Sequence, residues 1–237
     1  MSKKEDLRIQ RLGTIINNIS KKQESDVSRA ILRVIDYLQL KFPQVSLNHQ
    51  YQWKLINIVE SLSKTYKKVD FHYHFGTSSI RPDGGILFLQ DKNKSELYPI
   101  LIAEVKNQGT NDQRKMEGLT KQAKGNAIER LGKNVIGLRA ALLRESIFPF
   151  VCFGYGCDFT SDSSILDRVT TIAMFGHLNR TYLHADESGK FNRGSFYFRE
   201  NKWTIDEMSV IMSDIAERSI QYYFSKYQEH TFKKDSE

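Results

Sequence analysis

Apolar and polar residues along the chain fall into segments that predict helices and strands in turn. After Ser25 or Asp26, either of which can cap a helix, apolar residues recur at helical spacing until Pro43 ends the segment. Further helices are expected over residues 53–66, 126–144, 164–175 and 206–227. Strands are expected over residues 69–75, 84–89, 97–106 and 148–154. This succession indicates an α/β fold in which helices flank a central mixed sheet.

The length and composition of the chain fit one globular domain. Its 237 residues, 40% of them hydrophobic, are enough to bury a sizeable core. We expect a flexible or frayed polar segment over residues 1–24, a single domain over residues 25–230, and a tail over residues 231–237.

Charge and the absence of membrane signals narrow the class of partner. The net charge of +7 favours a polyanionic partner such as nucleic acid, although an acidic membrane surface would attract it equally. The sequence has no apolar stretch long enough to span a bilayer, and its start lacks the apolar core of a signal peptide. A cytoplasmic protein with no membrane partner is therefore expected.

Cys152 and Cys157 have no second pair to complete a zinc site, so both are expected to be reduced thiols.

Three ionisable residues stand at the ends of two apolar runs. Asp83 precedes one predicted strand, and Glu104 and Lys106 close the next. Side chains two apart on a strand share a face, so Glu104 and Lys106 project together, and Asp83 joins them if the two strands pair. A salt bridge at a strand end is the ordinary explanation of an isolated Glu-x-Lys. The full set of three residues instead favours a site for a bound cation, because adjacent carboxylates repel each other unless a cation lies between them.

Oxygen ligands of this kind suit Mg²⁺, which binds one or two carboxylates, several waters and substrate phosphate. The Lys106 ammonium can then orient or activate a water and stabilise charge on phosphorus. The segment therefore predicts a site that hydrolyses phosphodiesters.

A polar segment, Lys124-Gly-Asn-Ala-Ile-Glu-Arg130, begins the long helix predicted over residues 126–144. A purely structural role is open, with Gly125 and Asn126 entering the helix, Glu129 completing a capping box and Arg130 in solvent. Alternatively, asparagine matches the N6 and N7 groups of adenine, and arginine donates to bases or phosphate. Such a helix end could enter a major groove.

His72 and His74 share one face of the strand predicted over residues 69–75. They could form a metal pair, but the sequence offers no third ligand nearby, so hydrogen-bonded structural histidines are favoured.

The chain resembles the EcoRI/MunI family of type II restriction endonucleases, within the PD-(D/E)xK nuclease superfamily. Three motifs carry the resemblance in the same order and spacing: residues 78–85 (SSIRPDGG), 103–109 (AEVKNQG) and 125–130 (GNAIER). Weaker likeness covers residues 148–151, 165–168 and the chain from 211 onward. The resemblance implies a restriction-endonuclease-like fold and a homodimer that cuts palindromic double-stranded DNA. It also implies a cognate DNA methyltransferase as a functional partner.

The resemblance assigns roles to individual residues. Asp83 and Glu104 match the metal-binding carboxylates, Lys106 matches the catalytic lysine, and the implied cofactor is Mg²⁺. The residues implied in DNA binding are Gln108, Lys124, Gly125, Asn126, Ala127, Glu129, Arg130 and Arg168. Asn126, Ala127 and Arg130 fall where the family reads an inner AATT, and Gln108 where it touches a thymine. The implied products carry a 5′-phosphate and 5′-AATT overhangs.

Two departures from the family pattern concern the outer base pair. Lys124 stands where some members have small apolar residues and the member that reads CAATTG has an arginine, and lysine also donates to guanine. Of an expected arginine pair only Arg168 is present, with Thr171 in the second place. CAATTG or a bare AATT site is thus slightly favoured over GAATTC.

Two other functions remain as alternatives to a restriction endonuclease: a structure-specific repair or recombination nuclease, and a DNA-binding protein without catalysis.

Overall fold

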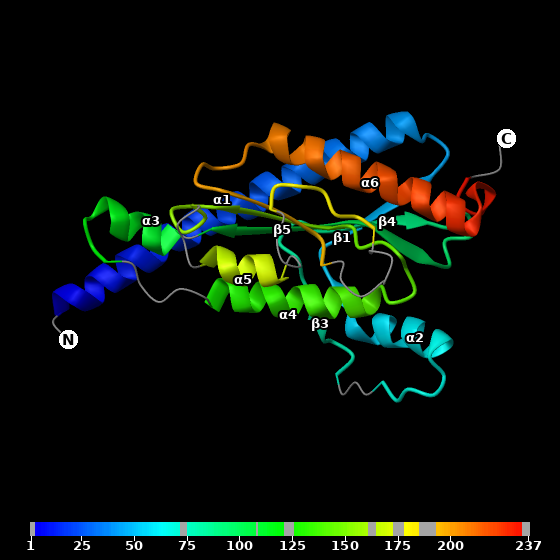
Figure 1. Ribbon diagram of the computed structural model, residues 1–237, viewed down its shortest axis with the longest axis horizontal. Helices are drawn as coiled ribbons and strands as arrows, with labels where there is room; N and C mark the ends of the chain where they lie inside the picture. The colour runs from blue at the N-terminus through cyan, green and yellow to red at the C-terminus, as the bar shows by residue number, and fades with distance from the viewer. Residues whose placement is uncertain are drawn as a thin grey trace.

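The computed structural model describes residues 3–71, 75–107, 109–120, 126–160, 165–172, 178–184 and 193–233. A five-stranded sheet forms its centre, with the order β1-β4-β5-β6-β7 (Figure 1). Its strands are β1 (Ser46–Gln50), β4 (Gly85–Gln90), β5 (Leu97–Asn107), β6 (Phe150–Tyr155) and β7 (Ser195–Arg199). The first three strands pair antiparallel, whereas β5, β6 and β7 are parallel neighbours. The mixed central sheet predicted from the sequence is confirmed.

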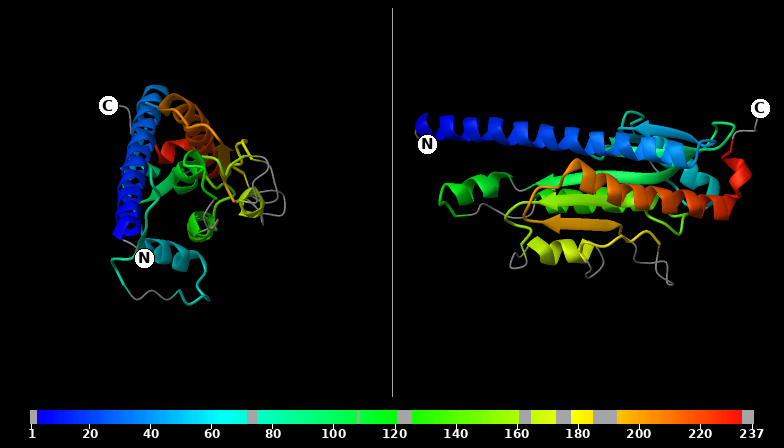
Figure 2. Two further views of the ribbon diagram at one scale, coloured as in Figure 1. Left: turned by 90° about the vertical axis from the view of Figure 1, so that its left-hand side faces the viewer. Right: turned by 90° about the horizontal axis from the view of Figure 1, so that it is seen from above.

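Helices cover both faces of this sheet. They are α1 (Lys3–Lys41), α2 (Leu55–Thr65), α3 (Gly109–Met116), α4 (Asn126–Ala141), α5 (Ile165–Ile172) and α6 (Ile205–Tyr227), followed by a 3₁₀ turn (Glu229–Thr231). Helices α1 and α6 lie side by side on one face, and α4 and α5 lie on the other (Figures 1 and 2). The chain passes from β5 through α3 and α4 to β6, so α4 belongs to the crossover between two parallel strands.

Two hydrophobic cores flank the sheet, one under each helical layer. Leu101 and Ala103 of β5 face α1 and α6, whereas Ile102 between them faces α4. Because both faces of β5 are buried, its sequence is a nearly continuous apolar run rather than an alternating one. Phe232, which the sequence placed in the tail, is fully buried in the first core.

The helix boundaries differ from prediction mainly at α1. The helix begins at Lys3, so the start expected at Ser25 or Asp26 is wrong. Asp26 lies inside the helix, where its carboxylate accepts a hydrogen bond from Lys202 at 2.6 Å instead of capping helix amides. The expected apolar face is confirmed: of its five predicted positions, Val27, Ile31, Val34 and Leu38 are fully buried and Ile35 is partly buried against the same core. The proposed segment boundaries stay a prediction.

Two local predictions between residues 53 and 75 differ from the structure. The strand expected over residues 69–75 is absent from the described residues 69–71 and 75, and Val69 and Phe75 are exposed. Residues 72–74, including the pair His72 and His74, lie outside the described residues. The helix expected from residue 53 begins at Leu55, because Trp53–Lys54 pairs as β2 with β3 (Ser79–Ile80).

Strands β1 and β7 and helix α3 were not predicted. Strand β1 is a half-buried edge strand with the mainly polar sequence SLNHQ, and α3 has almost no apolar residues. Among the described residues, no helix is long and apolar enough to cross a bilayer.

Candidate active site

The antiparallel pairing of β4 with β5 brings the three predicted catalytic residues together. Gly85 pairs with Ala103, and the Gly84 amide donates to the Ala103 carbonyl at 2.9 Å. Asp83 precedes β4 at this point and therefore lies beside Glu104 and Lys106 near the end of β5. The strand pairing expected from the sequence is confirmed.

Hydrogen bonds lock the three side chains into one cluster. The Lys106 Nζ donates to Asp83 Oδ2 at 3.1 Å and also to Glu104 Oε1. The Asp83 amide donates to Glu104 Oε2 at 3.0 Å, and the Val105 amide donates to Asp83 Oδ2 at 3.3 Å. Each carboxylate is thus fixed both by the lysine and by a backbone amide of the opposite segment.

The cluster is largely buried, so both burial and neighbouring charges shift the pKa values of Glu104 and Lys106. The side chain of Glu104 is only 3% exposed, and those of Lys106 and Asp83 are 17% and 25% exposed. Burial raises the pKa of the Glu104 carboxyl above its ordinary value, despite the opposing charge of Lys106. Burial alone would lower the pKa of Lys106, but the negative charges of Glu104 and Asp83 outweigh it and raise that pKa. Lys106 is therefore a firmly protonated cation between two carboxylates.

The donor set fits a divalent metal ion that also binds substrate. Two carboxylates converge on one point, which is the protein contribution that Mg²⁺ usually takes in phosphate-processing sites. No cluster of three or more His, Cys, Asp or Glu side chains among the described residues offers a cage made of protein ligands alone. Asp83 and Glu104 would hold such an ion, with the other positions left to water and phosphate.

Comparison with known proteins places the chain in a family. Residues 10–165, well over half of the chain, match the family model described as restriction endonuclease EcoRI. The chain belongs to the EcoRI family of restriction endonucleases. The expected enzyme class, a type II site-specific deoxyribonuclease, is confirmed, and double-stranded DNA is the substrate of such enzymes.

Two relatives show how far the similarity extends. The chain is 26% identical over 242 residues to the type II restriction enzyme RsrI of Cereibacter sphaeroides, covering 88% of this chain and 87% of the relative. It is 28% identical over 243 residues to the type II restriction enzyme EcoRI of Escherichia coli, covering 87% of each. The family resemblance therefore extends over most of the chain.

The residues that resemble the EcoRI recognition motif lie at the start of α4. Asn126, Ala127, Glu129 and Arg130 occupy its first turns, but their side chains lie outside the described residues, as do Gln108, Lys124 and Gly125 altogether. The helix is fixed to the sheet by a buried apolar face that includes Ile128 and Leu131. Figure 1 shows that α4 begins at the end of the sheet nearest α3, where β5 also ends.

Arg168, the remaining predicted DNA contact, is exposed on α5. Helix α5 shares the second core with α4, since Val169 and Ile165 are buried in it. Thr171, which replaces a second arginine in the expected pair, is exposed on the same helix.

Helix α3, which the sequence did not predict, ties β5 to its neighbours. The Cys157 backbone amide donates to Asp112 Oδ1 at 2.6 Å, and the side-chain Nδ2 of Asn111 donates to the buried Asp158 Oδ2. Lys115 pairs with Glu200 beyond β7 at 3.1 Å. The sequence offers little signal beyond the pair Asn111-Asp112, four and five residues after β5 ends, because α3 lacks an apolar repeat.

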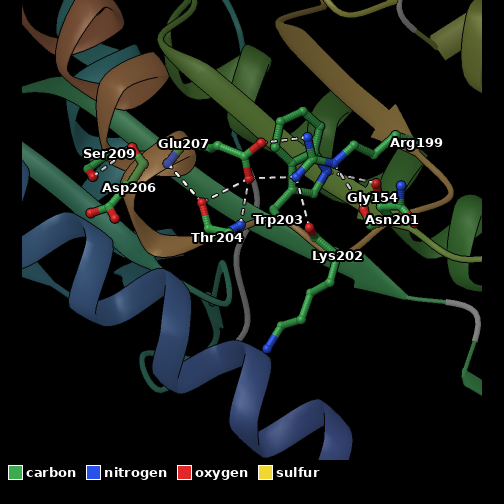
Figure 3. Close-up of polar contacts among 9 residues, drawn as sticks. All are labelled: Gly154, Arg199, Asn201, Lys202, Trp203, Thr204, Asp206, Glu207 and Ser209. Atoms are coloured by element: carbon green, nitrogen blue, oxygen red, sulfur yellow. Dashed lines mark hydrogen bonds and ion pairs between the residues drawn. The ribbon is translucent and has the colours of Figure 1, made fainter.

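A second polar cluster supports the strand next to Lys106 (Figure 3). Lys106 lies opposite Gly154 in the pairing of β5 with β6, and the indole of Trp203 donates to the Gly154 carbonyl at 3.0 Å. The guanidinium of Arg199 stacks on that indole at 3.7 Å and binds Glu207 with both terminal nitrogens. This cluster joins β6 and β7 to the start of α6, where Thr204 and Glu207 form a capping box.

The ion pair of Arg199 with Glu207 predicts acid-dependent stability. Hydrogen bonds from Arg199 and Thr204 lower the pKa of Glu207 from 4.5 to about 2. Because the pKa of Glu207 is lower in the folded protein than in the unfolded chain, its ionised form stabilises the fold. This stabilisation is complete above about pH 4.5 and is lost as the pH falls towards 2. Because Glu207 is 40% exposed, we expect the pair to contribute less than about 1 kcal/mol.

The measurement is the urea midpoint of unfolding for wild type and Glu207→Gln over a range of pH. The difference between them should be largest near neutral pH and should shrink steadily below about pH 4.5. A difference that is independent of pH would contradict this role of the Glu207 charge.

Proposed function

We propose that this enzyme cuts palindromic double-stranded DNA with an AATT core in a Mg²⁺-dependent reaction, as a homodimer in the cytoplasm. The observation that carries the proposal is the buried cluster of Asp83, Glu104 and Lys106 on two paired strands of an EcoRI-family chain. The proposed products have 5′-phosphates and 5′-AATT overhangs, and a cognate DNA methyltransferase would protect the host site.

The chain's own residues would divide the chemistry among them. Asp83 and Glu104 would hold a Mg²⁺ ion, which would supply Lewis-acid polarisation of the scissile phosphate. Lys106 would orient the attacking water with its Nζ and stabilise the negative charge that develops on the phosphate oxygens. The backbone amides of Asp83 and Val105 keep the two carboxylates in place, so that little reorganisation is needed on binding.

Base reading is assigned to the start of α4 and to the residues before it. Asn126, Ala127 and Arg130 would contact the inner AATT from the major groove, with Glu129 supporting them and Gln108 touching a thymine. Gly125 has no side chain and would allow close approach of the backbone to DNA, and Lys124 and Arg168 are the candidates for the outer base pair. CAATTG or a bare AATT site is slightly favoured over GAATTC.

The decisive experiment is digestion of a mapped plasmid with and without Mg²⁺, followed by sequencing of the ends. We expect cuts only with the metal, at AATT, with a four-base 5′ overhang, and the flanking bases read from the ends give the outer pair. Cutting of branched DNA but not of linear palindromes would indicate a repair or recombination nuclease. Specific binding with no cutting would indicate a regulator and would overturn the proposal.

Replacing Asn126 tests the recognition role separately from cleavage. We expect Asn126→Ala to reduce discrimination between an AATT duplex and a scrambled duplex by about 1–3 kcal/mol, because a bidentate contact to adenine is lost. The measurement is competition binding at fixed salt, since salt changes all phosphate-driven affinities. Asn134→Ala, a change of the same kind in the middle of α4, is the control. Equal discrimination by Asn126→Ala and wild type would show that Asn126 does not contribute to recognition of the AATT core.

A further inference from the structure

A histidine on the edge strand contacts the turn that carries Asp83. Strand β1 pairs antiparallel with β4, which brings His49 opposite Leu87 and Gln50 opposite Ile86. The side chain of His49 reaches beyond this pairing, and its Nε2 lies 2.9 Å from the carbonyl oxygen of Gly84. Gly84 directly follows Asp83, so the imidazole contacts the peptide next to a proposed metal ligand.

The chemistry of this contact fixes the direction of the hydrogen bond. A carbonyl oxygen can only accept, so the Nε2 of His49 must carry the proton and donate to Gly84. The half-buried ring also contacts the ring of Tyr51, with the ring centroids 4.8 Å apart. The hydrogen bond and the ring contact together restrict the orientation of the imidazole.

The turn is shaped to receive the imidazole closely. Gly85 has a φ of +82°, and a Cβ there would lie 2.6 Å from the Gln50 carbonyl oxygen and 2.8 Å from the His49 Nε2. The amides of the same turn are used inside the turn or on β5: that of Asp83 donates to Glu104 and that of Gly85 to Pro82. His49 supplies a fixed point for the turn from a third strand.

We propose that His49 is a positioning residue for DNA cleavage, which fixes the Gly84 peptide and thereby the direction of the Asp83 carboxylate. The proposal rests on the proposed function of Asp83. Without the donor, the peptide between Gly84 and Gly85 is held by fewer contacts and can rotate, which moves Asp83 relative to Glu104 and Lys106. A displacement of about 1 Å in a catalytic group can cost on the order of 100-fold in rate.

The test compares His49→Phe, His49→Asn and His49→Gln with wild type. Glutamine places an amide nitrogen as many bonds from the backbone as the histidine Nε2 and can restore the donor, whereas asparagine is too short and phenylalanine has none. We expect His49→Phe and His49→Asn to lower the single-turnover cleavage rate about 10- to 100-fold and to raise the Mg²⁺ concentration for half-maximal rate. His49→Gln should recover most of the rate.

DNA binding without metal and the thermal midpoint of unfolding should change little in all three variants, and Tyr51→Phe, directly after the end of β1, is the matched control. A wild-type rate in His49→Phe and His49→Asn would overturn the proposal, as would equal losses in His49→Asn and His49→Gln. If His49→Phe does not fold, the comparison of asparagine with glutamine decides. Failure of the wild type to cut AATT duplexes with Mg²⁺ would instead refute the proposed function.

Discussion

Lys106→Ala is expected to abolish DNA cleavage while it leaves site-specific DNA binding intact. The lysine lies on β5 between Asp83 and Glu104, whereas base reading is assigned to α4. Loss of a single preorganised donor that stabilises charge in a transition state typically costs about 10²–10³-fold in rate. Single-turnover cleavage and binding of an AATT duplex, measured on the same preparation, check both halves of the prediction.

The control for this variant is Lys115→Ala, the same substitution at an exposed lysine that forms an ion pair with Glu200. Surface pairs contribute about 0–1 kcal/mol, so this control should cut DNA at close to the wild-type rate. Cleavage by Lys106→Ala at the wild-type rate would show that Lys106 only neutralises its two carboxylate neighbours.

Glu104→Gln is expected to eliminate cleavage and, in the absence of metal, to tighten DNA binding. The substitution keeps an oxygen that can accept from the Asp83 amide, so the local fold should persist. It removes one of the two negative charges that would hold the metal ion, and that charge also repels the DNA phosphates when no metal is bound. Mg²⁺ titrations of the cleavage rate and metal-free binding measurements at several salt concentrations test the two effects.

Two outcomes would contradict this view of Glu104. Recovery of full activity at high Mg²⁺ would show that the glutamate is not essential for holding the metal. Weaker metal-free binding combined with a lower thermal midpoint would show that the substitution disrupts the fold, because Lys106 then loses one partner within a buried cluster.

The cluster of Asp83, Glu104 and Lys106 was predictable from the sequence because strand geometry determines it. Glu104 and Lys106 share a face by their spacing alone, and the short connection between two apolar runs makes antiparallel pairing with the Asp83 segment the natural arrangement. The core faces of α1 and α4 were predictable for the same kind of reason, since helical spacing of apolar residues specifies which positions are buried.

The features that the sequence did not reveal depend on contacts between distant segments. Asp112 and Asn111 bind residues of the turn after β6, more than forty positions away, and no local pattern marks such partners. His49 was hidden for the same reason, because β1 is an edge strand of mainly polar sequence whose place becomes clear only beside β4. Ser25 and Asp26 misled because good capping residues also occur inside helices when their side chains find other partners, as Asp26 does with Lys202.

The position of α4 in the crossover between β5 and β6 has a consequence for the evolution of new specificities. The proposed reading helix follows β5, which carries Glu104 and Lys106, by way of α3. It leads into β6, and β6 pairs with β5 in register. Substitutions at its tip can therefore change which bases are accepted while the spacing between the bases read and the bond cut stays constant. Descendants of this enzyme with altered outer bases should still leave overhangs of the same length.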